Sequence, residues 1–281
     1  MTTTLTSDRP AVTRRPIRHG RPLTRVSGLG FGVAMLWFSL LVLIPLTAVV
    51  VTATTGGWSG FWQAVTNEQT LAAIKLTVGT AFAVTLVDIV MGTMIAWVLV
   101  RDRFFGKRIL EVLIDIPFAL PTIVAGLVLL SLYGPKSSLG IDIANTPTAV
   151  FLAFLFVTLP FTVRTVQPVL AELDRDVEEA AMSLGASRVT VFRRIILPSL
   201  TPAIAAGAAL SFARGVSEYG SLVLLSGNLP MKTEVTSVRI LSSIENDNLD
   251  SAAAVATILL VISFVVLVLV DFLQRRMVRR G

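Results

Sequence analysis

The sequence predicts an all-α membrane protein with six transmembrane helices and both termini in the cytoplasm. Three observations support this prediction: 54% of the 281 residues are hydrophobic, only 15% are charged, and the apolar residues fall into six long runs. Because an average soluble domain carries about 25% charged residues, the expected solvent is the bilayer. The six runs lie at 30–52, 71–99, 114–133, 147–166, 199–225 and 251–272.

The first run follows a basic segment, residues 1–29, which is rich in Thr, Arg and Pro. This segment has too little apolar content to fold, so we expect a disordered cytoplasmic tail beside anionic lipid headgroups. Residues 30–52 contain no ionisable side chain, and at about 1.5 Å per residue they cross a hydrocarbon core of about 30 Å. A signal peptide has a shorter apolar core and a small-x-small cleavage site, so we expect this first helix to be retained.

The loops between the runs differ in positive charge, and this difference predicts the orientation. The N-terminal tail, the loop after the second run, the segment after the fourth run and the C-terminal tail hold six, four, five and four of the 24 Lys and Arg. Because cytoplasmic loops retain Lys and Arg during insertion, both termini are predicted to be cytoplasmic. The same basic residues form short blocks without interleaved aromatics, which argues against a nucleic-acid partner.

Several kinds of chemistry lack the residues they need. The chain has no cysteine, and its one histidine, His19, lies in the polar tail, so Cys-based metal sites and histidine proton relays are excluded. No Gly-x4-Gly-Lys-Ser/Thr sequence is present, so we expect this chain to bind neither ATP nor another cofactor. Hydrolase motifs such as Gly-x-Ser-x-Gly are also absent. These absences favour a transport subunit over an enzyme.

The segment between the fourth and fifth runs has the pattern of two short helices. Asp174 can cap the first helix and Gly185 can end it, because glycine readily takes a positive φ. Apolar residues recur at helical spacing in both helices, at Val177, Ala180, Ala181 and Leu184 and then at Val189, Phe192 and Ile196. Pro198 then begins the next run. An amphipathic helix outside the bilayer needs an apolar surface, which a groove on a partner protein would supply.

This segment resembles the EAA loop of ABC importer permeases, which reads Glu-Ala-Ala, three residues, Gly, nine residues, Ile-x-Leu-Pro. Every element of the motif is present, at Glu179, Ala180, Ala181, Gly185, Ile195, Leu197 and Pro198. The resemblance implies a type I (MetI-like) ABC importer permease core over residues 71–273, with the EAA loop at 172–198. It also implies that the loop docks on a separate ATPase subunit through Glu178, Glu179, Ala180, Ala181, Leu184, Gly185 and Ala186. The alternative is a helix that lies on the membrane surface.

Ionisable residues within the apolar runs are candidate site residues, because charges in the bilayer are costly. Arg214 and Glu218 are four residues apart and are predicted on one face of the fifth helix. They form either a structural salt bridge or a gate on the translocation path that meets a passing anion. Asp88 lies near the middle of the second run, where it is protonated, hydrogen-bonded or paired. The prolines of Ile116–Thr122 are expected to break or kink the third span.

Two further stretches, residues 95–134 and 217–240, resemble the T-type membrane subunit of sulfate/thiosulfate importers (CysT/CysU-like), within the binding-protein-dependent inner-membrane component family. The resemblance implies sulfate or thiosulfate transport across the bacterial inner membrane. The implied partners are a W-type permease subunit, two ATPase subunits that bind ATP, and an extracytoplasmic sulfate-binding protein. A molybdate/tungstate importer permease is the alternative. A secondary transporter would need paired broken helices, and the sequence shows no second copy of such a feature.

Overall fold

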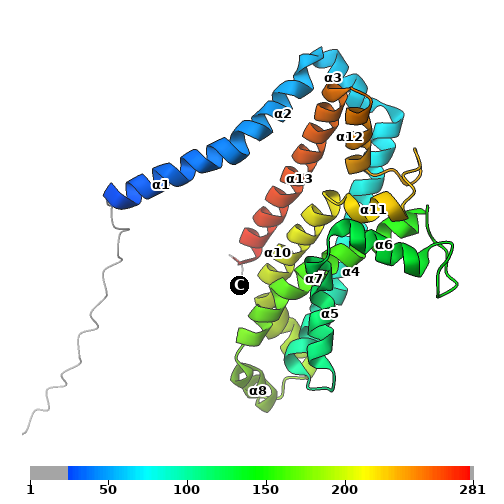
Figure 1. Ribbon diagram of the computed structural model, residues 1–281. Coiled ribbons are helices and arrows are strands. Elements are labelled where there is room, and N and C mark those ends of the chain that lie inside the picture. The colour runs from blue at the N-terminus through cyan, green and yellow to red at the C-terminus, as the bar shows by residue number, and fades with distance from the viewer. Residues whose placement is uncertain (1–24, 279–281) are drawn as a thin grey trace, which may run out of the picture. The chain divides into compact units, whose positions relative to one another are not determined.

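The computed structural model describes residues 25–278, and every regular element in this range is helical (Figure 1). The chain divides into two compact units, residues 1–47 and 48–281, which are described separately. Residues 1–24 of the predicted N-terminal tail lie outside the described range, and its last five residues belong to the first helix.

The first unit contains α1 (Arg25–Phe38), a π-helical turn η1 (Ser39–Leu43) and the start of α2 (Ile44–Thr55). With the rest of α2, these elements form a 29-residue helix, Ser27–Thr55, that is long and apolar enough to cross a membrane. The helix contains the whole of the predicted first span, residues 30–52.

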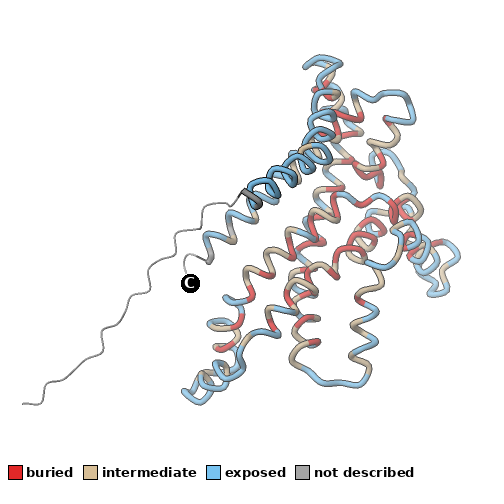
Figure 2. The backbone as a smooth tube through the Cα atoms, turned by 60° about the vertical axis from the view of Figure 1, so that its left-hand side comes forward, coloured by how far each residue is buried: buried red, intermediate tan, exposed pale blue. Residues whose placement is uncertain are grey.

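The centre of the second unit is formed by three long helices that pack on one another: α4 (Glu68–Arg101), α7 (Pro147–Glu172) and α10 (Leu197–Val216). Two glycines permit the close approach. A Cβ added to Gly92 would lie 2.8 Å from Cβ of Thr162, and one added to Gly207 would lie 2.9 Å from its Cα. Small residues let membrane helices pack tightly in this way. The buried residues gather where these helices face one another (Figure 2).

The remaining helices pack around this centre. The last helix, α13 (Leu249–Val278), packs against α10, α12 (Thr236–Glu245) and α3 (Gly57–Thr66). The short helices α8 (Arg175–Ser183) and α9 (Arg188–Val191) occupy one end of the bundle, which we call the loop end (Figure 1).

The predicted third span, residues 114–133, is not one straight helix. It consists of α5 (Lys107–Ala119) and α6 (Thr122–Tyr133), which are bent by 118° relative to each other. Pro121 directly precedes α6 and has no N–H to continue α5, so the predicted break at the proline segment is confirmed. The described residues contain five helices long and apolar enough to span a membrane, or six if the bent pair is one span.

A second break was not predicted. The run 199–225 was predicted as one span, but α10 ends at Val216 and α11 (Gly220–Leu225) begins after three residues. The helices α6 and α11 pack closely, since a Cβ on Gly126 would lie 2.6 Å from the carbonyl oxygen of Ser221. The second unit therefore has two broken helices whose short halves pair.

Two of the three apolar cores of the second unit involve the long helices α4, α7 and α10. The loop-end core joins α4, α7, the π-helical turn η2 (Phe192–Ile196) and α10, and it includes Leu99, Val163, Val166, Leu170, Ile196 and Leu200. The other core lies nearer α11 and α12 and includes Val84, Phe154, Phe212, Leu222, Leu225 and Val238. The same three long helices run through both cores and so connect the loop end of the bundle with the other end.

Candidate functional site

The first helix of the predicted EAA loop, α8, begins where the sequence indicated. The Asp174 side chain accepts a hydrogen bond from the backbone N–H of Asp176, with the two atoms 3.0 Å apart. This contact satisfies one of the free N–H groups at the start of the helix. Asp176 and Glu178 in the first turn add negative charge at the positive end of the helix dipole.

Gly185 ends α8 by a Schellman motif. Its φ is +90°, and two hydrogen bonds close the turn: Ala186 N–H to Ala181 O at 3.1 Å, and Gly185 N–H to Met182 O at 2.9 Å. This pair of bonds places glycine at the left-handed position that follows the helix. The predicted role of Gly185 as the end of the first helix is confirmed.

Three of the four apolar residues that the spacing placed on one face, Val177, Ala180 and Leu184, are exposed. Leu184 is 90% exposed and Val177 is 51% exposed, and Glu179 and Ala180 are exposed with them. Ala181 and Ala186 are half-buried and pack against the loop-end core instead. The loop therefore has an outward surface of mixed apolar and acidic character, and two alanines that fit it to its own bundle.

The second helix of the loop differs more from the prediction. Its first four residues form α9, and Phe192–Ile196 form a π-helical turn, η2. Val189 is 65% exposed, whereas Val191 and Ile196 are buried, so the expected face of Val189, Phe192 and Ile196 is wrong. The wider π turn shifts the register by about one residue. The helix then continues into α10, giving one 29-residue helix, Arg188–Val216.

Glu178 does not face outward with Glu179. It forms an ion pair with Arg101, the last residue of α4, and the two side chains are only 17% and 10% exposed. The Arg101 guanidinium lies 5.7 Å from the centre of the Trp97 ring. Trp97 in turn packs edge-on against Phe192 of η2, with ring centres 5.6 Å apart. Arg101 and Trp97 did not appear among the predicted site residues, because no local pattern relates them to the loop.

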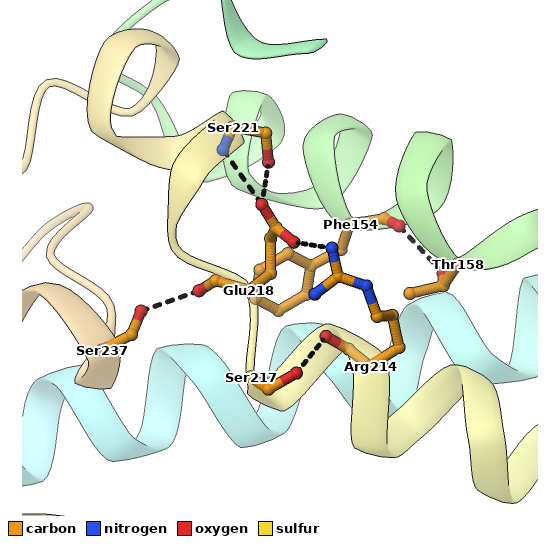
Figure 3. A network of polar contacts seen from close by, with 7 residues as sticks. All are labelled: Phe154, Thr158, Arg214, Ser217, Glu218, Ser221 and Ser237. Carbon is orange, nitrogen blue, oxygen red and sulfur yellow. Dashed lines mark hydrogen bonds and ion pairs between the residues drawn. The ribbon is translucent and has the colours of Figure 1, made fainter. Parts of the chain in front are cut away.

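Arg214 and Glu218 form an ion pair with 2.7 Å between the Arg214 nitrogen and the Glu218 oxygen. Glu218 lies beyond the end of α10, so the expectation of one continuous helical face is wrong. Its other carboxylate oxygen accepts bonds from Ser221 N–H and Oγ, both at 2.9 Å (Figure 3). The Glu218 side chain is 1% exposed and that of Arg214 is 28% exposed. The pair therefore sits at the break between α10 and α11.

Asp88 is fully buried at the junction of α4, α7 and α10. One carboxylate oxygen accepts a hydrogen bond from Thr158 Oγ1 at 2.7 Å and another from Ser211 Oγ. No cationic side chain pairs with it among the described residues. Of the three states considered for Asp88, the structure shows the hydrogen-bonded one.

Within residues 25–278, no three His, Asp or Glu side chains lie together in a way that could hold a metal ion. The candidate site is thus a set of exposed loop residues and buried polar contacts that position helices. Such an arrangement can dock a partner and transmit movement.

Comparison with known proteins shows the family that the chain is similar to. Residues 88–280 match the family described as binding-protein-dependent transport system inner membrane component. The sulfate transport system permease protein CysT of Salmonella typhimurium is 41% identical, covering 90% of this chain and 94% of that protein. CysT of Synechocystis sp. is 42% identical, covering 86% of this chain and 87% of that protein.

Solved structures of importers share the fold. A bacterial alginate ABC transporter in complex with an alginate pentasaccharide-bound periplasmic protein gives a TM-score of 0.73 at 17% identity, over 90% of this chain and 94% of that chain. The inward-facing MetNI methionine ABC transporter gives 0.54 at 18% identity, over 75% and 94%. The predicted type I importer permease fold is confirmed.

Proposed function

The chain belongs to the binding-protein-dependent transport system inner membrane component family, and from this premise we propose that it is the T-type permease subunit of a sulfate/thiosulfate importer. The observation that carries the proposal is the identity of 41% to the sulfate permease of Salmonella typhimurium over nearly the full length of both chains. The relatives named above transport sulfate, so the molybdate/tungstate alternative is not favoured.

The proposed complex contains a W-type permease, two ATPase subunits and an extracytoplasmic sulfate-binding protein. ATP binds to the ATPase subunits, and this chain supplies half of the pathway without a cofactor of its own. The chain lies in the bacterial inner membrane with both termini in the cytoplasm, because the four most basic segments then lie on the cytoplasmic side. The loop end of the bundle faces the cytoplasm in this orientation.

Docking on the ATPase is proposed to use the outward surface of the loop. Leu184, 90% exposed at the tip, supplies the apolar anchor, and Glu179 supplies a charge for a cation on the partner. An exposed leucine of this kind is costly in water but stabilising in a groove, at about 1.5–3 kcal/mol for full burial. Ala180 has a small side chain and Gly185 has none, so the ATPase can approach the loop closely. Ala181 and Ala186 hold the loop to its bundle.

For Arg214 and Glu218 the geometry supports a structural pair better than a gate. An anion that displaced Glu218 from Arg214 would leave a buried carboxylate without its cation, which is costly. The pair also fixes the break between α10 and α11 through Ser221. Only the exposed part of Arg214 is available to meet an anion on the translocation path.

The first test is uptake of radiolabelled sulfate in cells that lack this chain, with unlabelled thiosulfate and molybdate as competitors. We expect uptake to be lost without the chain, restored by the wild-type chain, and inhibited by thiosulfate. Leu184→Glu should abolish uptake and co-purification with the ATPase, whereas the matched Leu184→Met variant should keep both. Normal sulfate uptake together with defective molybdate uptake would move the substrate to the alternative.

A further inference from the structure

We propose that Arg101 is a positioning residue for coupling: its ion pair with Glu178 fastens the docking helix α8 to the end of the membrane helix α4. The proposal rests on the proposed function, since it concerns how ATPase movement enters the membrane helices. It assigns Glu178 an intramolecular role, in contrast to the outward role that the loop motif implies for it.

The helix α8 is weakly held by apolar contacts. None of its nine residues is buried, and only Glu178 and Ala181 are half-buried. Ala181 contributes a single methyl group to the loop-end core. The ion pair is therefore a large share of what attaches this helix to the bundle.

The pair joins elements that the chain does not connect locally. Arg101 and Glu178 are 77 residues apart in sequence. The helix α8 is already linked through the backbone to α7 on one side and to the long helix Arg188–Val216 on the other. Neither link reaches α4. The ion pair thus provides a direct connection from the docking helix to α4.

The surroundings of Arg101 favour a fixed contact. Its side chain is 10% exposed and that of Glu178 is 17% exposed, so water screens the pair less than it screens a surface pair. Trp97 lies beneath the guanidinium at 5.7 Å, a cation–π distance. Because Trp97 also packs against Phe192, the contacts of Arg101 connect α8, α4 and η2. A planar guanidinium suits this combined pairing and stacking better than an ammonium group does.

Other ion pairs of the described residues lack this combination. Arg164–Asp115 joins α7 to α5 and is 32% and 48% exposed, and Arg275–Asp271 lies within α13 and is 74% and 55% exposed. Arg214–Glu218 joins residues only four positions apart, at the break between α10 and α11. Only Arg101–Glu178, among these four, links the docking helix to a membrane helix.

The functional consequence is specific. When the ATPase carries α8 with it, α4 moves too, and the bundle changes its shape as a unit. Without the ion pair, α8 stays docked through its outward surface, but α4 follows only through its packing on α7 and α10, so less of the movement reaches it. ATP hydrolysis then continues while transport falls.

The test uses charge reversal in the complete importer. Arg101→Glu and Glu178→Arg each place two like charges together, and each is expected to lower sulfate uptake about tenfold at equal membrane abundance. The purified complex should keep its ATPase activity. The double variant should restore uptake to within about threefold of wild type, because the pair re-forms with its charges exchanged. Arg101→Lys should fall between wild type and Arg101→Glu.

Arg275→Glu is the matched control, because it breaks an exposed pair in α13 and should leave uptake unchanged. Normal uptake in both single variants, or a double variant no better than the singles, would overturn the proposal. Failure of the wild-type chain to restore sulfate uptake would instead overturn the proposed function.

If the charge variants do not assemble with the other subunits, a covalent link between α8 and α4 tests the proposal instead. The chain has no cysteine, so Arg101→Cys with Glu178→Cys introduces the only two thiols in this chain. Joining them with a short bifunctional thiol reagent should restore uptake above that of the unlinked double variant, since α8 and α4 move together. A lower uptake after cross-linking would show that the two helices must separate, and the proposal would be wrong.

Discussion

The two most shielded ion pairs of the described chain differ in what they connect. Arg101–Glu178 joins residues 77 positions apart, at the loop end of the bundle. Arg214–Glu218 joins residues four positions apart, at a break between two helices. A long-range pair can carry displacement from one element to another, whereas a local pair can only shape its own turn. Shielding alone therefore does not identify a coupling residue, and connectivity has to be considered with it.

Among the variants that keep the docking residue Leu184, the largest effect is expected at Gly185, which sets the angle between α8 and the following helix. Gly185→Val should lower sulfate uptake more than tenfold at equal membrane abundance, because a β-branched residue resists a φ of +90°. No atom lies within 4 Å of an added Cβ, so the effect is conformational and not steric. Gly185→Asn is the matched control, since asparagine tolerates this region, and it should retain uptake within about threefold. Equal uptake in both variants would contradict the interpretation.

A smaller effect is expected from Arg214→Gln, and it should appear in stability. The variant leaves the Glu218 carboxylate buried with only its bonds to Ser221, at a cost of about 1–3 kcal/mol. We expect the purified complex to unfold several degrees lower, while the affinity and rate of sulfate uptake stay unchanged at a permissive temperature. Glu218→Gln keeps an acceptor for Ser221 and removes the charge, so it should cost less. Reduced uptake at full stability would assign Arg214 to the translocation path instead.

The smallest effect is expected from Asp88→Asn. The amide oxygen can accept the bonds from Thr158 and Ser211 that the carboxylate accepts now, and a buried charge is removed. We expect uptake within about twofold of wild type and a stability change below about 1 kcal/mol. Asp88→Leu is the contrast, because it leaves the Ser211 hydroxyl without its acceptor, and it should be clearly destabilised in a thermal unfolding assay. A large loss in Asp88→Asn would show that the charge itself is required.

The features predicted correctly from the sequence are those with a local physical signal. Asp174 and Gly185 bound α8 because capping and positive φ depend on residue type alone. The break at Pro121 follows from the missing N–H of proline. The apolar runs locate the spans because a bilayer demands length and low charge.

The features that were missed depend on tertiary contacts. Nothing in the run 199–225 marks the end of α10, because Glu218 stabilises that break through its bonds to Ser221 and Arg214. The exposed position of Val189 follows from a π-helical turn, which a period of 3.6 residues does not anticipate. Arg101, the partner of Glu178, lies 77 residues away in the sequence. A single sequence carries no signal for a contact between residues so far apart.

The continuity of Arg188–Val216 has a mechanical meaning. A helix of 29 residues is about 40 Å long, so about 10 Å of it projects beyond a hydrocarbon core of about 30 Å. The projecting part is a lever arm, and the tight packing at Gly207 against Thr162 is the natural fulcrum. A tilt of about 5° about this fulcrum displaces the Arg188 end, about 28 Å away along the helix, by about 2.5 Å. In the proposed importer, a push on the loop end therefore moves the other end of the same helix in the opposite direction.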